Sequence, residues 1–380
     1  MQTRNHCLRA FLPFVLCVFL LIPGSLCTAQ EIPHTQAAIS RLMETYVAED
    51  RFNGCLLVAH HHEIIYTSVH GIANPATGEA LTRNHRFRLA SVSKQLCAVG
   101  VMVLKDRGKL RLSDDIRAFL PDLPYPGITI RHVLTHTSGL PDYGELLERY
   151  WDTGAEDSAR RKIVGNQDVY RLLVSYHPPV AFQPGERYAY CNTGYNLLAL
   201  VIEQVAGMPF PEFMRTQVFL PAGMTHTFVN AADGSLPIRL RARGFKSTAA
   251  DPGYLLTDSH YQNGLYGDGG IYTTIDDMYA YDQALHSGKL VNKKTLLEAY
   301  APAKLNNGTT HDYGFGWSII SFPHGDVLAH GGGWAGFSAF MLRDRHSGDM
   351  IIQLTNRPGI RRGELVFAVY DILRQQRQDK

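Results

Sequence analysis

The sequence predicts an α+β fold, in which an antiparallel sheet is flanked by the terminal helices and carries a large, mostly helical insertion. Segments with strand character lie near both ends of the chain, at 52–69 and 317–355, whereas 91–297 is mostly helical. Strands at the two ends of a chain usually complete one sheet. We therefore expect one domain at 30–380, with an α/β part at about 30–90 and 300–380 and a helical part at about 91–299.

The first 29 residues have the pattern of a secretory signal peptide. Arg4 and Arg9 precede an apolar run at 10–22, and small residues follow as far as Ala29. A membrane-spanning helix needs roughly 20 apolar residues, so cleavage after Ala29 is favoured over an uncleaved anchor. The remaining chain would contain no membrane span and would be secreted or periplasmic.

The periodicity of apolar residues predicts the elements of the α/β part in order. A first helix is expected at 33–49 and a hairpin of two strands at 52–59 and 64–69. Adjacent side chains on a turn point apart, so the histidines at 60–62 in this hairpin are not expected to bind a metal. The later strands are predicted at 317–321, 327–329, 337–342 and 350–355, and a closing amphipathic helix at 364–375.

Composition argues against several kinds of partner and cofactor. The formal net charge is only +2 and no long basic run is present, so we do not expect the protein to bind nucleic acid. Three of the six cysteines fall in the first 29 residues, and Cys55, Cys97 and Cys191 show no metal-binding spacing. We expect no disulfide framework, no metal and no organic cofactor.

The motif Ser91-Val92-Ser93-Lys94 opens an apolar run at 96–104 that predicts a buried helix closed by Gly108. Residues three apart on a helix share a face, so the Ser91 hydroxyl and the Lys94 amine can meet. A serine hydroxyl is a poor nucleophile until a neighbouring base takes its proton, and a lysine beside an apolar helix can help. Alone, the motif is more typical of an N-capping serine followed by a solvated lysine.

Two further segments carry candidate site residues. Tyr190 and Asn192 flank one residue before a helix expected at 195–206, so both can face one pocket from an extended loop. A phenol that loses its proton near a lysine can act as a general base. Three glycines follow His330, and their backbone N–H groups could approach a ligand closely. Alone, these segments are equally consistent with a structural loop and a flexible turn.

Together, these three segments resemble the serine β-lactamase and penicillin-binding protein superfamily. The resemblance is closest to its class C branch, which includes D-alanyl-D-alanine carboxypeptidases, D-aminopeptidases and esterases. It covers roughly 36–375 and implies the β-lactamase/transpeptidase-like fold. Ser-x-x-Lys is unspecific alone, but it occurs with Tyr-x-Asn, His-x-Gly and three further segments typical of the family, at 134–141, 182–192 and 267–270.

The resemblance implies catalytic roles for three residues. Ser91 would be the acyl-accepting nucleophile and Lys94 its partner on the same helix. Tyr190 would share proton transfer with Lys94, because the identity of the base is disputed in related enzymes.

The resemblance also implies substrate-binding roles for Asn192, His330, Gly332 and Gly333. Asn192 would contact the substrate, and the N–H groups of Ser91 and Gly333 would form an oxyanion hole. His330 departs from the β-lactamase pattern, in which a lysine faces the substrate carboxylate. A histidine is mostly neutral at neutral pH, so we expect neutral esters or amides to be preferred, with carboxylate substrates improving below about pH 6.5.

The expected function is that of an exported serine hydrolase that works through an acyl-enzyme. Its substrates would be esters, amides or D-amino-acid peptides, whether small molecules or peptidoglycan-like. One alternative is a β-lactamase proper, and another is a catalytically weak cell-wall or penicillin-binding protein. A classical α/β-hydrolase is disfavoured because the chain contains no Gly-x-Ser-x-Gly.

Overall fold

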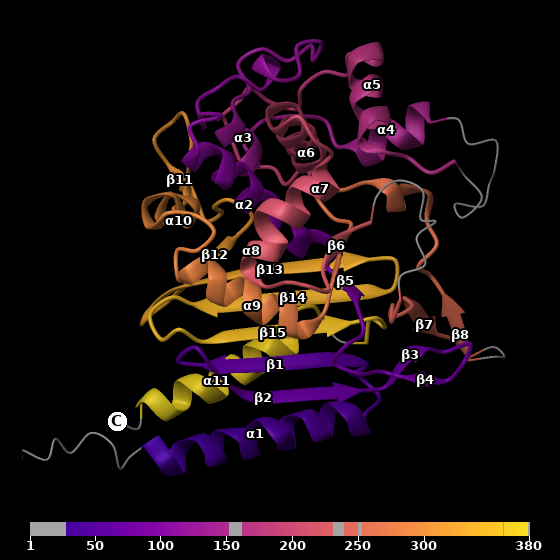
Figure 1. Cartoon of the computed structure of the whole chain (residues 1–380), viewed down its shortest axis with the longest axis vertical. Helices are drawn as coiled ribbons and strands as arrows, with labels where there is room; N and C mark the ends of the chain where they lie inside the picture. The colour runs from indigo at the N-terminus through magenta and orange to yellow at the C-terminus, as the bar shows by residue number, and fades with distance from the viewer. Residues whose placement is uncertain (1–27, 152–161, 231–238, 250–252, 360, 379–380) are drawn as a thin grey trace, which may run out of the picture.

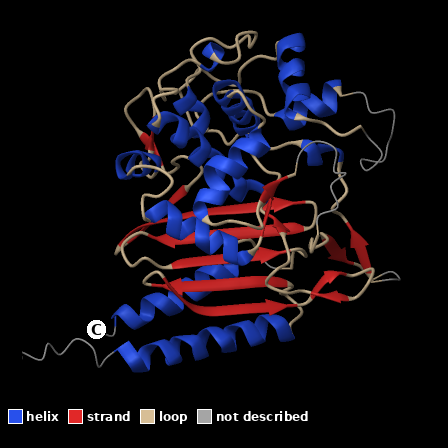
Figure 2. Ribbon diagram, in the orientation of Figure 1, coloured by secondary structure: helices blue, strands red, loops and turns tan. Residues whose placement is uncertain are grey.

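The computed structural model describes residues 28–151, 162–230, 239–249, 253–359 and 361–378. The predicted signal peptide at 1–29 lies almost wholly outside these residues. The described chain forms an antiparallel sheet with two helices on one face and a helical body on the other (Figures 1 and 2). The predicted α+β class is confirmed, with an antiparallel sheet, flanking terminal helices and a large helical insertion.

The main sheet joins the two ends of the chain, as predicted. Its strand order is β12-β13-β14-β15-β1-β2, and every neighbouring pair is antiparallel. The first strands pair with the last because β1 lies against β15, with Gly54 opposite Thr355. The strands span β1 (Gly54–His60), β2 (Glu63–His70), β12 (Ser318–Phe322), β13 (Gly325–Trp334), β14 (Phe337–Asp344) and β15 (Met350–Thr355).

Alternation along the strands divides the core between the two faces of the sheet. Leu56 and Val58 pack under the terminal helices α1 (Thr28–Ala48) and α11 (Glu364–Gln378). Their neighbours Cys55 and Leu57 point to the other face and join the core of the helical body. Because β1 is buried on both faces, it is a continuous apolar run in the sequence.

The helical body holds the apolar run after Ser91 at its centre. The side chains at 93–104 are buried all round α2 (Ser93–Asp106), which packs on α6 (Asn192–Ala206). The other α-helices are α3 (Ile130–Leu134), α4 (Tyr143–Tyr150), α5 (Asn166–Tyr176), α7 (Phe210–Met214), α8 (Leu220–Ala222), α9 (Ile275–His286) and α10 (Lys293–Ala299). Short helical turns form η1 (Ala90–Val92), η2 (Ile116–Ala118), η3 (Arg215–Phe219) and η4 (Tyr261–Gly264).

The insertion is less purely helical than predicted, because short strands cross it. The three-stranded sheet β5-β9-β6 places Phe87 opposite Thr273 and ties the segment before Ser91 to the distant chain at 271–273. Such short pairings leave no periodic pattern in the sequence. The short strands are β3 (Ile72–Asn74), β4 (Glu79–Ala80), β5 (Phe87–Arg88), β6 (Phe228–Val229), β7 (Phe245–Ser247), β8 (Tyr254–Leu256), β9 (Ile271–Thr273), β10 (Ala303–Lys304) and β11 (Thr310–His311).

Two predicted boundaries are wrong in ways that affect the candidate site. The strand expected at 327–329 continues to Trp334, so His330 and the three glycines lie within β13 rather than in a turn. The helix expected from Tyr195 begins at Asn192, which therefore lies on the first turn of α6 rather than on an extended loop. Both elements extend because backbone pairing continues through the polar and glycine residues.

The structure places the three cysteines of the described chain, and it overturns the argument against a histidine cluster in the hairpin turn. Cys55, Cys97 and Cys191 are buried and free. In the hairpin turn, however, the rings of His60 and His61 lie 4.0 Å apart rather than pointing away from each other. Left-handed backbone at His61 and at the next residue turns the chain so tightly that neighbouring side chains converge.

No single helix in the described part of the chain has the length and apolarity of a membrane span. One strongly bent pair, Asn192–Ala206 with Phe210–Ala222, passes the same criterion by length and composition.

Candidate active site

Ser91 lies at the middle of the turn η1 that leads into α2, beside the end of β13. The preceding residue, Ala90, has φ of 47°, an uncommon conformation for a residue with a side chain. The backbone is held in place because the Leu89 N–H donates to the Ile271 carbonyl of β9 at 2.9 Å. The short sheet that the sequence did not predict therefore fixes the entry to the Ser91 turn.

Lys94 lies directly beneath Ser91, as the three-residue spacing predicts. Its Nζ donates to Ser91 Oγ at 3.2 Å, to Asn192 Oδ1 at 2.8 Å and to the Asp268 carbonyl at 3.0 Å. The side chain has no exposed surface. The amide oxygen and the carbonyl hold the amine against the serine hydroxyl. Helical spacing predicts only the contact with the serine.

Gly332 explains how β13 approaches the Ser91 turn so closely. A Cβ at Gly332 would lie 2.2 Å from the Leu89 carbonyl and 2.9 Å from the Ser91 nitrogen. Only a residue without a side chain allows this contact. Strand β12 pairs with β13 only as far as Ala329, so the following residues of β13 have an edge without β12. Gly333, on that stretch, lines the same pocket as Ser91.

Asn192 is fixed at the start of α6 by a carboxylate that the sequence analysis did not select. The Asp142 carboxylate accepts from the Asn192 backbone N–H at 2.8 Å and from the Gly144 N–H at 3.0 Å. One carboxylate thus caps α4 and also holds the first residue of α6. Its negative charge is favourable there because the N-terminus of each helix carries a partial positive charge. The Asn192 side chain is then free to accept from Lys94 and to line the pocket.

Tyr190 lies beside Lys94, with its ring centre 4.8 Å from Nζ and 42% of the residue exposed. Its hydroxyl makes no hydrogen bond with a described residue, Ser91 and Lys94 included. The structure therefore brings Tyr190 to the lysine through the ring face, and proton transfer by its hydroxyl stays a prediction.

A chain of hydrogen bonds behind the site fixes the protonation of two buried histidines. The Cys191 N–H donates to His136 Nδ1 at 3.1 Å, which leaves the His136 proton on Nε2, 3.2 Å from the Tyr313 oxygen. Tyr313 then donates to His330 Nε2 at 2.9 Å, and His330 Nδ1 donates to the Gly331 carbonyl at 2.8 Å. In this arrangement each imidazole accepts a hydrogen bond at one ring nitrogen and donates from the other, so both histidines are neutral. Neither Tyr313 nor this role of His136 was foreseen from the sequence.

His330 does not face the substrate side of the pocket, contrary to the expectation from the sequence. It is 6% exposed, is not part of the pocket wall, and points into the Tyr313 network. Burial, with the nearby Lys94 charge, lowers its pKa to about 3. A pKa this low argues against the expected gain in activity on carboxylate substrates below about pH 6.5, because His330 would remain neutral there.

Acid should instead destabilise the fold through His330. In the unfolded chain this histidine binds a proton near pH 6.5, whereas in the folded chain it does so only near 3. Between these values the unfolded state holds more protons, so the free energy of unfolding falls as pH falls. In urea denaturation, the loss from pH 7 to pH 5 should be smaller in His330→Gln than in wild type by about 2 kcal/mol. Equal losses would show that His330 is not buried as a neutral imidazole.

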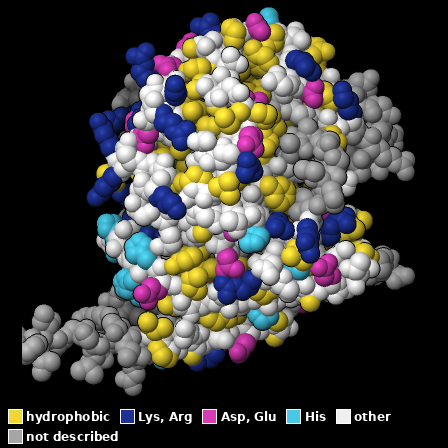
Figure 3. Space-filling view, viewed as in Figure 1, with side chains coloured by type: hydrophobic (Ala, Val, Ile, Leu, Met, Phe, Trp, Pro, Cys, Tyr) yellow, Lys and Arg dark blue, Asp and Glu magenta, His cyan; other side chains and the backbone are white. Residues whose placement is uncertain are grey.

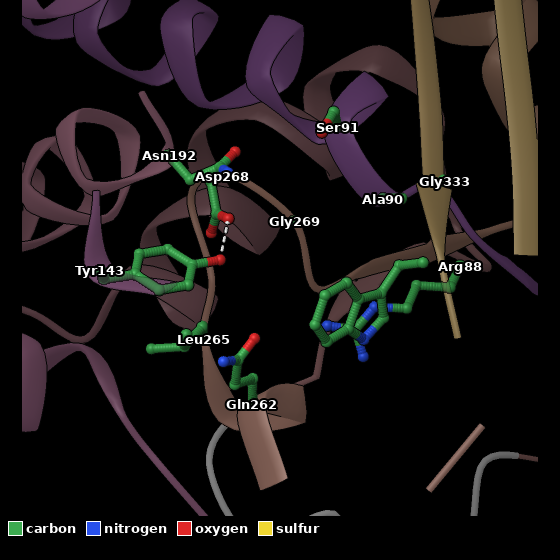
Figure 4. A pocket seen from close by; sticks show the side chains of 11 residues that line it. Arg88, Ala90, Ser91, Tyr143, Asn192, Gln262, Leu265, Asp268, Gly269 and Gly333 are labelled. Atoms are coloured by element: carbon green, nitrogen blue, oxygen red, sulfur yellow. Dashed lines mark hydrogen bonds between the residues drawn. The ribbon is translucent and has the colours of Figure 1, made fainter. Parts of the chain in front are cut away.

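The pocket in front of Ser91 includes residues that the sequence analysis did not select (Figure 4). Arg88 and Tyr143 lie on opposite sides of it, and Asp268 lies beside Tyr143. The Tyr143 hydroxyl donates to Asp268 Oδ2 at 2.7 Å, while Oδ1 has no partner. Burial raises the pKa of Asp268. Arg88 gave only a weak signal, as a charged residue inside an otherwise apolar segment that leads into the Ser91 motif.

The arrangement is suited to attack by a serine on a carbonyl group. It offers a hydroxyl hydrogen-bonded to a buried amine, an adjacent phenol, and a pocket lined by both Ser91 and Gly333. These are the parts that covalent catalysis through an activated nucleophile requires.

Comparison with known proteins agrees with this chemistry. The chain is similar to Penicillin-binding protein 4* of Bacillus subtilis, with 37% identity over 84% of this chain and 71% of that protein. It is 28% identical to Esterase EstB of Burkholderia gladioli, over 84% of this chain and 90% of the esterase. Among solved structures, the D-amino acid amidase of Ochrobactrum anthropi SV3 superposes with a TM-score of 0.74 at 26% identity, covering 90% of this chain and 99% of the amidase.

The beta-lactamase family matches residues 39–370, a range that includes every candidate site residue predicted from the sequence. With a match over most of its length and the same fold, the chain belongs to the beta-lactamase family.

Proposed function

We propose that this protein is an exported serine hydrolase that forms an acyl-enzyme on Ser91. The observation that carries the proposal is the contact between the Ser91 hydroxyl and the buried Lys94 amine at 3.2 Å, on the wall of an open pocket. Asn192 Oδ1 and the Asp268 carbonyl can accept the two N–H groups of a neutral amine, which leaves its lone pair to receive the Ser91 proton.

In the proposed reaction, Ser91 Oγ attacks the substrate carbonyl and its proton passes to the Lys94–Tyr190 pair. The N–H groups of Ser91 and Gly333 stabilise the oxyanion. The bond to the leaving alcohol or amine then breaks, and the same pair returns the proton to the leaving group. Water hydrolyses the ester on Ser91 in the reverse sense, which releases the acid and restores the enzyme.

The substrate class is an ester, an amide or a D-amino-acid derivative. The relatives are named as an esterase, D-aminopeptidases, a β-lactamase and penicillin-binding proteins, which all fit acyl transfer at a serine. A β-lactamase proper and a catalytically weak penicillin-binding protein are the alternatives. The Ser91–Lys94 contact supports acylation of Ser91 in both a hydrolase and a penicillin-binding protein, so turnover of the acyl-enzyme is what distinguishes the two.

Activity-based labelling and a substrate panel test this proposal. The protein is treated with a fluorophosphonate and then assayed with p-nitrophenyl esters, D-amino-acid amides and nitrocefin. We expect one fluorophosphonate adduct per chain, on Ser91, and turnover of at least one ester or amide. An adduct on Ser91 without turnover of any of them would favour the binding protein, and nitrocefin as the best substrate would favour the β-lactamase.

Export is a separate part of the proposal, supported by the charged and apolar pattern of residues 1–29. The full chain, expressed in a bacterium with a periplasm, should appear outside the cytoplasm with its N-terminus near Gln30. Mass spectrometry of the fractionated protein measures both. Full-length protein that retains Met1 in the membrane fraction would indicate an anchor.

A further inference from the structure

Arg88 is a buried cation on the wall of the Ser91 pocket. It is 4% exposed, and it comes from β5, three residues before the nucleophile. Within the described chain, no carboxylate lies within 4.0 Å of its guanidinium, and the nearby Asp258 is already paired with Arg241 and Arg243. Arg88 and Asp268 interact electrostatically across the pocket without forming an ion pair, and a buried guanidinium that lacks an ion-pair partner is costly, so its position calls for an explanation.

The groups that do contact Arg88 are neutral and leave part of it unsatisfied. Nη1 donates to Asn263 Oδ1 at 3.1 Å, and the same oxygen accepts from Trp334 at 2.8 Å. The Tyr272 ring centre lies 5.8 Å from the guanidinium carbon. The Arg88 Nε is buried and has no hydrogen-bond partner among the residues that the structure describes. Asn263 thus positions the guanidinium without neutralising it.

The other charged groups at the pocket do not replace a ligand for Arg88. Asp268 lies across the pocket beside Tyr143, to which it is hydrogen-bonded (Figure 4). Lys94 is directed at Ser91, Asn192 and the Asp268 carbonyl. His330 is held in the Tyr313 network, outside the pocket wall.

We infer that Arg88 is an anion subsite, and that the preferred substrates carry a carboxylate beside the scissile ester or amide. This inference rests on the proposed function and names the substrate class more closely. It also revises the expectation of a preference for neutral substrates, which was based on His330 alone. A guanidinium donates two parallel hydrogen bonds to a carboxylate, so the subsite would orient the substrate as well as attract it.

Two esters that differ only in one charge test the subsite. Mono(p-nitrophenyl) glutarate and p-nitrophenyl valerate have the same acyl chain length and leaving group, but only the first has a free carboxylate. The measured quantity is the ratio of their kcat/KM values in wild type, Arg88→Met and Arg88→Lys. We expect wild type to favour the glutarate by about tenfold or more, the methionine variant to lose this preference, and the lysine variant to recover part of it.

The valerate serves as the internal control for the Ser91 chemistry. Any loss of valerate kcat/KM, or of the rate of fluorophosphonate labelling, in Arg88→Met measures damage to the pocket, and the subsite is read from the additional loss on the glutarate. Equal losses on both esters would assign Arg88 a structural role, and an unchanged ratio would overturn the subsite. Failure of the proposed function would look different, because wild type would then hydrolyse neither ester, whether or not fluorophosphonate labels Ser91.

A second inference comes from the opposite end of the main sheet, where the turn of the β1–β2 hairpin meets the β14–β15 turn. Histidine side chains gather on this flank of the molecule, at the left of Figure 3. His60 Nδ1 lies 2.8 Å from Asp349 Oδ1, and the His60 and His61 rings are 4.0 Å apart. One ligand atom from each of the three residues lies within 4.8 Å of the others.

The donor set suits a divalent transition-metal ion. Two imidazoles and a carboxylate are the ligands of many zinc sites, and ligand atoms about 2 Å from zinc lie roughly 3.4 Å apart in a tetrahedron. Asp349 is fully buried, whereas His61 is exposed and can close the remaining distance by side-chain rotation if its Nδ1 leaves the Ser347 carbonyl, which now lies 2.8 Å away. We propose that His60, His61 and Asp349 bind a zinc-type ion, with the fourth position open to water.

Zinc titration of the whole chain tests this site by a readout that does not depend on catalysis. Competition with a fluorescent zinc chelator should show one specific ion per chain in wild type. His61→Gln and Asp349→Asn should each weaken it at least tenfold, while His177→Gln, which removes an exposed histidine elsewhere, should not. Because Asp349 is buried, thermal unfolding without zinc is used to check that Asp349→Asn is folded. If Asp349→Asn misfolds, the exposed variant His61→Gln decides the test. Unchanged affinity in His61→Gln, or an equal loss in His177→Gln, would overturn the site.

Discussion

Replacing Ser91 with alanine should abolish covalent labelling by fluorophosphonates and lower kcat by about three orders of magnitude or more. Ser91 Oγ is the hydroxyl that Lys94 contacts, at 3.2 Å, and it lies on the pocket wall. The substitution removes one oxygen atom and leaves the η1 turn and the β13 contact unchanged, so the protein should remain folded. Intact-protein mass spectrometry and a p-nitrophenyl ester assay measure the two effects.

The second serine of the motif provides a matched control. Ser93 is buried two residues later, and its Oγ accepts from the Ile271 N–H at 3.4 Å. Ser93→Ala should keep fluorophosphonate labelling, because this hydroxyl supports β9 rather than contacting Lys94. Turnover in Ser91→Ala above about one tenth of wild type would show that another group is the nucleophile.

The sheet and the terminal helices could be predicted because burial sets their pattern directly. Strand β15 was predicted with its actual ends, since Met350–Thr355 is buried along its whole length and turn residues flank it. The short strands β5, β6 and β9 were missed because pairs such as Phe87 with Thr273 are created by tertiary contact. No local propensity distinguishes them from loops.

The candidate site divides in the same way between local and long-range information. Ser91 and Lys94 could be placed together because helical spacing is a local rule. Lys94 also donates to Asn192 and Asp268, which lie 98 and 174 residues away from it in the sequence, so no spacing rule predicts these contacts. The partner of His330 is Tyr313, which lies between β11 and β12, and its local sequence gives no sign that it bridges two histidines.

The revised role of His330 follows from this limit of sequence patterns. A motif alignment shows which residue occupies a position, but not which way its side chain points or what it contacts. The resemblance implies that His330 stands where β-lactamases have a substrate-facing lysine, but in the structure it completes a buried hydrogen-bond chain. The cation on the pocket wall comes from Arg88, on a different element.

Lys94 and Tyr190 are expected to act on the same proton, and the structure explains why they should be tested together. Lys94 Nζ lies 3.2 Å from Ser91 Oγ and 4.8 Å from the centre of the Tyr190 ring. The lysine is fully buried, whereas the tyrosine is 42% exposed. If both serve one proton transfer, removing either should disable the step, and removing the second should then matter little.

Lys94→Met should therefore lower kcat/KM by about a thousandfold, and Tyr190→Phe by about a hundredfold. Methionine retains most of the buried volume of lysine, so it limits the cavity that alanine would create, although Asn192 Oδ1 and the Asp268 carbonyl lose a donor. Thermal unfolding separates that loss of stability from the loss of rate. The double variant should be within about threefold of Lys94→Met alone, since one proton transfer cannot be lost twice. If the two losses multiply instead, Lys94 and Tyr190 act in different steps, and the exposed phenol would then belong to leaving-group protonation or deacylation rather than to activation of Ser91.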